Sequence, residues 1–265
     1  MEALGALLKQ AVAENQIDFH PKCKRINLVH LSFADDVLVV MEANMKSLSA
    51  LKDCLSKLES QTGLKVNNAK TSILIAGMNQ NDKEMLASSL NVTLTVPPVK
   101  YLGLPLTASN LSIRDCYPLV EKVQKRIQNW KNLWLTQAGR VLLINTVLCA
   151  FLVYWGQAFL LPCSILDQVQ NISLHFLWAG PKMEAKMHHA NKKKVVRSKQ
   201  QGGLGIKDTR AWNKAAQCGL LFRVIKRDPS VWVQWVWENP LRNKFFWTMK
   251  KPSDCPGVLS SILEC

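Results

Sequence analysis

The feature of the sequence with the clearest chemical potential is a pair of adjacent carboxylates, Asp35 and Asp36, which follow Phe33 and Ala34. Two neighbouring carboxylates repel each other unless a cation offsets their charge. Enzymes that transfer nucleotides hold two divalent ions about 3.5 to 4 Å apart on such groups, and the ions activate a hydroxyl and stabilise the leaving phosphate. Aspartate is also common in ordinary turns, so an acidic turn without catalysis is the alternative interpretation.

Apolar segments on both sides of the pair would hold the two aspartates in place. Residues 26–33 alternate between two faces, and residues 37–40 are an unbroken apolar run. This pattern predicts two strands of a β-hairpin, with Ala34, Asp35 and Asp36 at its tip. Rigid strands would give the carboxylates the fixed geometry that metal catalysis requires.

The other elements of the chain predict an α+β fold that becomes mainly helical after residue 113. Asn44 is expected to cap a helix that ends at Gly63, as a glycine after the last helical turn often does. Short strands are expected at 72–75, 92–96 and 99–102, the last two around Pro97 and Pro98. Up to residue 106 this is a small α+β layer.

Residues 141–161 form a long apolar run whose strongly polar members are only Asn145, Thr146 and Gln157. By length the run could span a bilayer. Because Pro162 follows directly, no second span is present and polar residues dilute the run, we favour a central helix of a helical subdomain. A membrane is therefore not an expected partner.

The positive charge is concentrated in one part of the sequence. The net charge is +15, and residues 182–251 carry 17 basic against 4 acidic side chains. Five of the nine tryptophans lie in the same segment. Such a composition can neutralise phosphates and stack on bases. For each tryptophan taken alone, packing in the core is the favoured interpretation. The summed charge of the segment instead favours binding to nucleic acid. The tryptophans are Trp212, Trp232, Trp235, Trp237 and Trp247.

Two other classes of site are excluded by spacing. The eight cysteines form no CxxC pair, which argues against a disulfide framework or a zinc ribbon. Gly202, Gly203 and Gly205 follow a run of lysines, but the spacing of a nucleotide-binding loop with its trailing Lys-Ser or Lys-Thr is absent.

Several motifs accompany the aspartate pair in a fixed order, and together the chain resembles the reverse transcriptase of LINE-type (non-LTR) retrotransposons, in particular the plant lineage. The resemblance covers essentially the whole chain. The matching segments are residues 20–23, 33–36, 63–71, 100–106, 130–131, 138–140, 143–145, 201–206 and 212–213.

The resemblance implies a partial palm of β-hairpins with packed helices in residues 1–106. It further implies a helical thumb-like region in 107–180 and a basic, Trp-rich connection in 181–265. The full family enzyme would copy an RNA template onto a DNA primer in the nucleus, using Mg2+ (or Mn2+) and no small-molecule substrate except deoxynucleoside triphosphates.

The resemblance also assigns roles to single residues. Asp35 and Asp36 would be catalytic metal ligands, and Lys70 would bind the incoming nucleotide. The primer end would be held by Tyr101, Leu102 and Gly103. The template or duplex backbone would be bound by Lys192, Lys193, Lys194, Arg197 and Lys199.

The family enzyme also needs a third carboxylate on an earlier palm strand and a set of fingers residues. The only acidic residues before the hairpin are Glu2, Glu14 and Asp18, and none lies in an apolar strand. We therefore expect a C-terminal fragment that is inactive as a polymerase on its own. The alternatives are a non-catalytic, basic nucleic-acid-binding module and a gene product without selected activity.

Overall fold

The computed structural model describes residues 2–107, 111–131, 133–181, 190–244 and 246. These residues form two compact units. Unit 1 combines residues 1–106 with residues 227–247, and unit 2 contains residues 107–226. The chain is a mixture of helices and small sheets, which is compatible with the expected α+β class.

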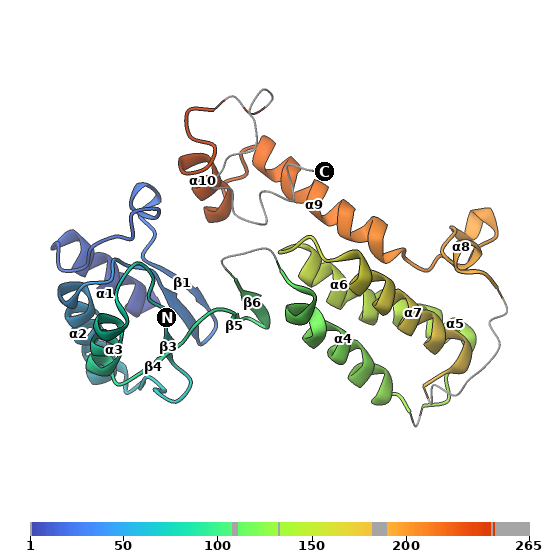
Figure 1. The fold of residues 1–265 in the computed structure, drawn as a ribbon, viewed down its shortest axis with the longest axis horizontal. Coiled ribbons are helices and arrows are strands. Elements are labelled where there is room, and N and C mark those ends of the chain that lie inside the picture. The colour runs from blue at the N-terminus through green and yellow to red at the C-terminus, as the bar shows by residue number, and fades with distance from the viewer. Residues whose placement is uncertain (1, 108–110, 132, 182–189, 245, 247–265) are drawn as a thin grey trace. The chain divides into compact units, whose positions relative to one another are not determined.

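Unit 1 contains the strands of the described chain (Figure 1). They pair as three separate two-stranded sheets: β1 with β2 and β5 with β6 antiparallel, and β3 with β4 parallel. The elements are α1 (Glu2–Ala13), η1 (Lys24–Ile26), β1 (His30–Phe33), β2 (Asp36–Val39), α2 (Met45–Thr62), β3 (Ser72–Ile73), α3 (Gln80–Leu90), β4 (Thr93–Leu94), β5 (Val99–Tyr101), β6 (Leu104–Leu106) and α10 (Val231–Glu238).

The core of unit 1 lies between α1, α2 and the hairpin β1–β2. Leu8 of α1 is fully buried, and Leu51 and Leu58 of α2 pack in the same cluster. The expected ends of α2 are confirmed. Asn44 accepts a hydrogen bond from the Ser47 N–H at 2.7 Å, and Gly63 ends the helix at φ 73°.

The strand expected from residue 26 begins later, at His30. Residues 24–26 form the 3-10 turn η1 instead, and Asn27 follows it with a φ of 50°. Residues 26–29 alternate as a strand does, but the left-handed conformation of Asn27 interrupts the extended chain that a strand requires. The hairpin is therefore shorter than the sequence predicted.

Helix α10 joins unit 1 although about two hundred residues separate it from η1 in the sequence. The Arg25 guanidinium donates to the Glu238 carbonyl at 3.3 Å, and the Asn239 amide donates to the Lys22 carbonyl at 3.0 Å. Val233 and Val236 are the buried residues of this helix. The segment just before the aspartate hairpin is thus held by the far end of the chain.

Unit 2 is made of helices packed side by side. Helix α7 contacts α4, α5 and α9, and α9 also contacts α6. Phe176 of α7 is fully buried, and its ring lies 5.4 Å from that of Trp130 between centroids. The elements are α4 (Ile113–Gln128), α5 (Gln137–Leu143), η2 (Ile144–Leu148), α6 (Cys149–Gly156), α7 (Cys163–Ala179), α8 (Lys192–Val195), η3 (Lys199–Gln201) and α9 (Thr209–Ile225).

The long apolar run forms a continuous helix, Gln137–Gly156, in which η2 is a π-helical segment. Within the described residues it alone is long and apolar enough to cross a membrane, by length and composition. Its last turn is bonded to polar side chains: the Gln217 amide donates to the Gly156 carbonyl at 2.6 Å. The run packs against α7 and α9, as expected for a helix of a helical subdomain, but only 28% of its 18-residue apolar window is buried, so the expected burial of this helix is only partial.

Candidate functional site

The hairpin that carries the aspartate pair has a two-residue turn. Phe33 lies opposite Asp36 in the strand register, so only Ala34 and Asp35 form the turn. Ala34 has a φ of 51°, a left-handed conformation that costs an L-residue about 1–2 kcal/mol. Asp36 is the first residue of β2 rather than part of the tip, which corrects the three-residue tip expected from the sequence.

The two faces of the hairpin have different surroundings. Val37 and Val39 pack against the core of unit 1. Side chains alternate along a strand, so Asp36 shares the opposite face with Leu31 and Phe33. Phe33 is 63% exposed and Leu31 38% exposed. The hairpin therefore presents a carboxylate beside apolar side chains on an accessible surface.

His30 anchors the hairpin on α1. A side chain carbon added at Gly5 would lie 2.8 Å from the Nε2 atom of His30, so the imidazole occupies the space that this glycine leaves. Burial of the ring, followed by the charge of Lys9, lowers the pKa of His30 below its usual value. The imidazole is thus neutral at pH 7, and it acts as a packing group next to the site.

Asp35 and Asp36 are both exposed, and among the described residues neither carboxylate makes a hydrogen bond or an ion pair. Carboxylate oxygens suit Mg2+, which is usually held by one or two carboxylates while water and substrate phosphates complete its shell. No group of three or more His, Cys, Asp or Glu side chains exists in the described part of the chain. The pair therefore fits one ion that shares its shell with a substrate, and it does not complete a two-metal centre.

Lys70 lies in the exposed loop between α2 and β3. Its backbone N–H donates to the carbonyl of Asn67 at 3.0 Å, and the Thr71 hydroxyl donates to the same carbonyl at 2.9 Å. Asn67 thus fixes the loop while the lysine side chain remains in solvent. The described hydrogen bonds and ion pairs do not join Lys70 to either aspartate.

Tyr101, Leu102 and Gly103 lie in a second hairpin, β5–β6. Tyr101 is the last residue of β5 and pairs with Leu104, so Leu102 and Gly103 form its turn. Their φ values are 49° and 79°, a pair of left-handed residues typical of a two-residue hairpin turn. The hairpin lies in a sheet separate from β1–β2, and the strand expected at 92–96 pairs with β3 instead of with β5.

The basic residues expected to bind nucleic acid lie together on α8, on η3 and, for Arg197, between these two elements of unit 2. Lys193, Lys194, Arg197 and Lys199 are exposed. Lys192 differs, because its ammonium lies 3.4 Å from the Asp167 carboxylate on α7. The carboxylate that compensates Lys192 thus comes from outside the basic segment 182–251.

Asp167 is a residue that sequence reasoning missed. It binds Arg210 of α9 through two oxygen–nitrogen contacts, one of them 3.0 Å long, as well as Lys192. The hydrogen bond from Arg210, with further contributions from Lys192, holds the pKa of Asp167 below its ordinary value. Nothing in the local sequence pointed to this residue, because its two partners lie 25 and 43 residues away.

The loop after α8 owes its shape to close backbone contacts. A side chain carbon added at Gly203 would stand 2.1 Å from the Arg197 carbonyl oxygen, a distance that no real carbon reaches. Asn145 of η2 holds the end of this loop. Its amide donates to the Gly205 carbonyl at 2.8 Å, and its oxygen accepts from the Lys207 N–H at 3.1 Å. These contacts fix the exposed cations relative to the helices of unit 2.

Several motif residues therefore have structural roles. Arg140 donates to the carbonyls of Leu177 and Trp178, at 3.1 and 3.3 Å, and so caps the end of α7. Asn213 is buried, and its oxygen accepts from the Leu161 N–H at 3.0 Å. A buried polar group without a hydrogen-bond partner would lower the stability of the fold at these positions. These residues position the helices that carry the basic surface.

The tryptophans of the basic segment do not act as one set. Trp212 lies on α9 of unit 2, 43% exposed, with the Lys207 ammonium 4.2 Å from its ring centroid. Trp232, Trp235 and Trp237 are half-buried on α10 of unit 1. Trp247 lies outside the described residues. The structure thus separates residues that the composition of the segment grouped together.

Comparison with known proteins shows similarity to a protein family and to a plant protein. Residues 3–106 match the family described as "Reverse transcriptase (RNA-dependent DNA polymerase)". A protein of Arabidopsis thaliana whose name calls it a ribonuclease H protein is 32% identical over 114 residues. That alignment covers 43% of this chain and 18% of the plant protein, so the chain spans less than a fifth of the relative it matches.

Proposed function

We propose that this chain is a nucleic-acid-binding part of a non-LTR reverse transcriptase. In it Asp35 and Asp36 supply metal ligands, and unit 2 binds the backbone of the template and primer. The observation that carries the proposal is the reverse transcriptase match over residues 3–106, which includes the exposed hairpin with its two free carboxylates. The name of the plant relative is also in keeping with a nucleic-acid partner.

The proposed roles follow from the resemblance of these residues to the motifs of the family. Asp35 and Asp36 would hold a divalent ion, which, when bound, lowers the pKa of the primer 3′-hydroxyl and offsets phosphate charge. Lys70, exposed on a loop fixed by Asn67, would pair with the phosphates of the nucleotide. The β5–β6 turn, at Leu102 and Gly103, would support the primer end.

The basic surface on α8 and η3 supports the binding half of the proposal. Lysine and arginine side chains on a fixed loop can neutralise several phosphates at once, and each contact releases a counterion. The loop is fixed by Asn145 and by the Gly203 backbone contact. A surface of this kind binds nucleic acid largely independently of sequence.

Primer extension on an RNA template with Mg2+ tests the catalytic half. We expect no extension by the 265-residue chain, because no third carboxylate joins Asp35 and Asp36 among the described residues. Loss of one positioned catalytic group typically costs about 10³-fold in rate or more. The same sample must bind the primer–template hybrid, so that the absence of extension reports on catalysis.

The Asp35→Asn, Asp36→Asn double variant is the control for that assay. Extension by the wild-type chain that disappears in the double variant would contradict the expected inactivity and would require a third ligand within this chain. Absence of both extension and hybrid binding would instead contradict the proposed function itself.

A non-catalytic nucleic-acid-binding module is the second candidate. It is favoured by one observation, the cluster of exposed cations on unit 2, which needs neither aspartate. Its signature would be hybrid binding that is unchanged by the double variant and by divalent ions. The first candidate predicts that Mg2+ and nucleotide together tighten hybrid binding by the wild-type chain and not by the double variant.

A further inference from the structure

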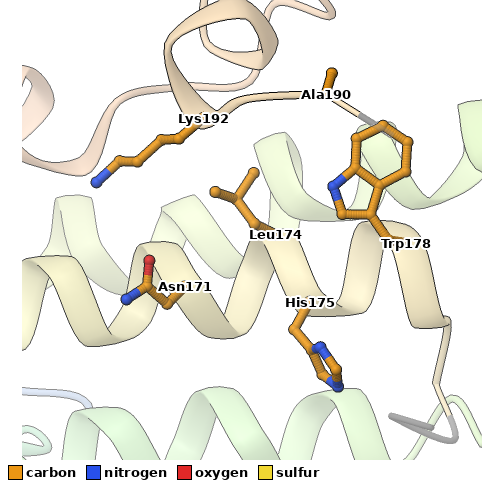
Figure 2. Close-up of a pocket in the computed structure, with 6 residues that line it drawn as sticks. All are labelled: Asn171, Leu174, His175, Trp178, Ala190 and Lys192. Carbon is orange, nitrogen blue, oxygen red and sulfur yellow. The ribbon is translucent and has the colours of Figure 1, made fainter. Parts of the chain in front are cut away.

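A pocket of about 370 Å³ lies on unit 2, next to the segment of residues 192–199 that carries the exposed cations. Its floor is one face of α7, where Asn171, Leu174 and Trp178 follow one another at helical spacing, and its roof is the segment with Ala190 and Lys192. Figure 2 shows Leu174 and Trp178 pointing from α7 towards that roof, and His175 of the same helix also lines the pocket. The pocket does not involve the hairpin aspartates.

The lining combines the three kinds of group that a nucleotide needs. Trp178 is a half-buried aromatic ring, and Leu174, only 6% exposed, gives an apolar floor beside it. The Asn171 side chain can donate and accept a hydrogen bond, as the edge of a base requires. Lys192 brings a positive charge to the rim, above Asn171 in Figure 2.

The charge at the rim remains positive although Lys192 contacts Asp167. Arg210 binds both oxygens of the Asp167 carboxylate, including the Oδ1 atom that Lys192 contacts, so these three side chains carry one net positive charge. The bridge also restrains Lys192 at the edge of the pocket. The chain then continues into the exposed cations Lys193 and Lys194, which can contact neighbouring phosphates.

We propose that this pocket binds a single unstacked base of a single-stranded nucleic acid, with the base against Trp178 and its phosphate at Lys192. The inference rests in part on the proposed function, because it extends the nucleic-acid surface of unit 2 to a defined base site. Aromatic side chains bind single strands in this manner, since every base has a face for stacking and a duplex does not expose it.

The experiment compares two substitutions at one position in the full chain. Fluorescence anisotropy would measure binding of a short oligouridylate and of a blunt RNA–DNA hybrid of the same length. Trp178→Leu is expected to weaken oligouridylate binding by about tenfold, which is typical of the loss of one base–aromatic stack. Trp178→Phe keeps an aromatic face and should stay within about threefold of wild type.

Hybrid binding is expected to be equal in all three proteins, because the hybrid keeps its bases stacked. If the Leu and Phe variants lost oligouridylate binding equally, the proposed base pocket would be wrong. Retained hybrid binding in the same proteins would still agree with the proposed function. If the wild-type chain bound neither the hybrid nor the oligouridylate, both the base pocket and the proposed function would be wrong.

Cross-linking of the wild-type chain gives a second result that does not depend on a variant folding. A 5-iodouridine oligonucleotide, irradiated in complex with the chain, should attach to the peptide that contains Trp178. Attachment only to peptides of unit 1, or to the one with Trp212, would contradict the proposal.

Discussion

Replacing Lys193, Lys194, Arg197 and Lys199 together by glutamine is expected to weaken binding of a primer–template hybrid by about 10³- to 10⁴-fold at about 0.1 M salt. Each phosphate contact contributes about 0.9 to the slope of log affinity against log salt, which amounts to roughly eightfold per contact at that salt. The slope itself should fall by about 3 to 4. Anisotropy titrations at several salt concentrations measure both quantities.

A matched control removes the same charge elsewhere. Lys9, Lys46, Lys52 and Lys57 are exposed on α1 and α2 of unit 1, and none belongs to the proposed nucleic-acid surface. Their replacement by glutamine should change affinity by less than about tenfold and leave most of the slope. If both quadruple variants lose affinity and slope equally, binding follows net charge, and the assignment of the surface to α8 and η3 is wrong.

Substituting Gly203 by alanine is expected to destabilise unit 2 by about 3 kcal/mol, the upper part of the usual range for overpacking. The added carbon would stand 2.1 Å from the Arg197 carbonyl oxygen and 2.5 Å from its carbonyl carbon. Both are backbone atoms, so no side chain can rotate away. Thermal unfolding by circular dichroism should show a midpoint lower by about 6–12 °C.

Substitution of Gly219 in α9 by alanine is expected to have the opposite effect on stability. No atom lies within 4 Å of a carbon added there, and alanine is the better helix former by about 1 kcal/mol. Gly219→Ala should therefore melt at or above the wild-type temperature. A Gly203→Ala protein that melts with it would contradict the described packing of the loop.

The sequence was sufficient to predict elements whose causes are local. Alternating and continuous apolar runs predicted the hairpin around Asp35, because β1 and β2 pair through a two-residue turn. Asn44 and Gly63 predicted the ends of α2, since both act within one helical turn.

Contacts between distant residues could not be predicted in this way. Asp167 meets Arg210 and Lys192 only because α7 packs beside α9 and α8. Likewise, the spacing around Gly203 excluded a nucleotide-binding loop but did not indicate the actual constraint on this residue, which is the carbonyl of Arg197. These relations depend on how helices pack, and a single sequence without distances does not contain them.

The composition of the basic segment, residues 182–251, did not predict how its residues are distributed in the fold. Its total charge suggested one surface, but the structure divides the segment between two units at residue 227. Helix α10, with three of the tryptophans, binds η1 through Glu238 and Asn239. The candidate surface for nucleic acid is consequently smaller than the segment and lies on α8 and η3.

The most direct measurement of the proposed metal site is paramagnetic line broadening by Mn2+ in NMR spectra of the full chain, bound to a primer–template hybrid and an unreactive nucleoside triphosphate. The amide signals of residues 33–38 should broaden first, and this effect should disappear in the Asp35→Asn, Asp36→Asn variant. Broadening that begins elsewhere, or that is the same in the double variant, would contradict a metal site at the hairpin.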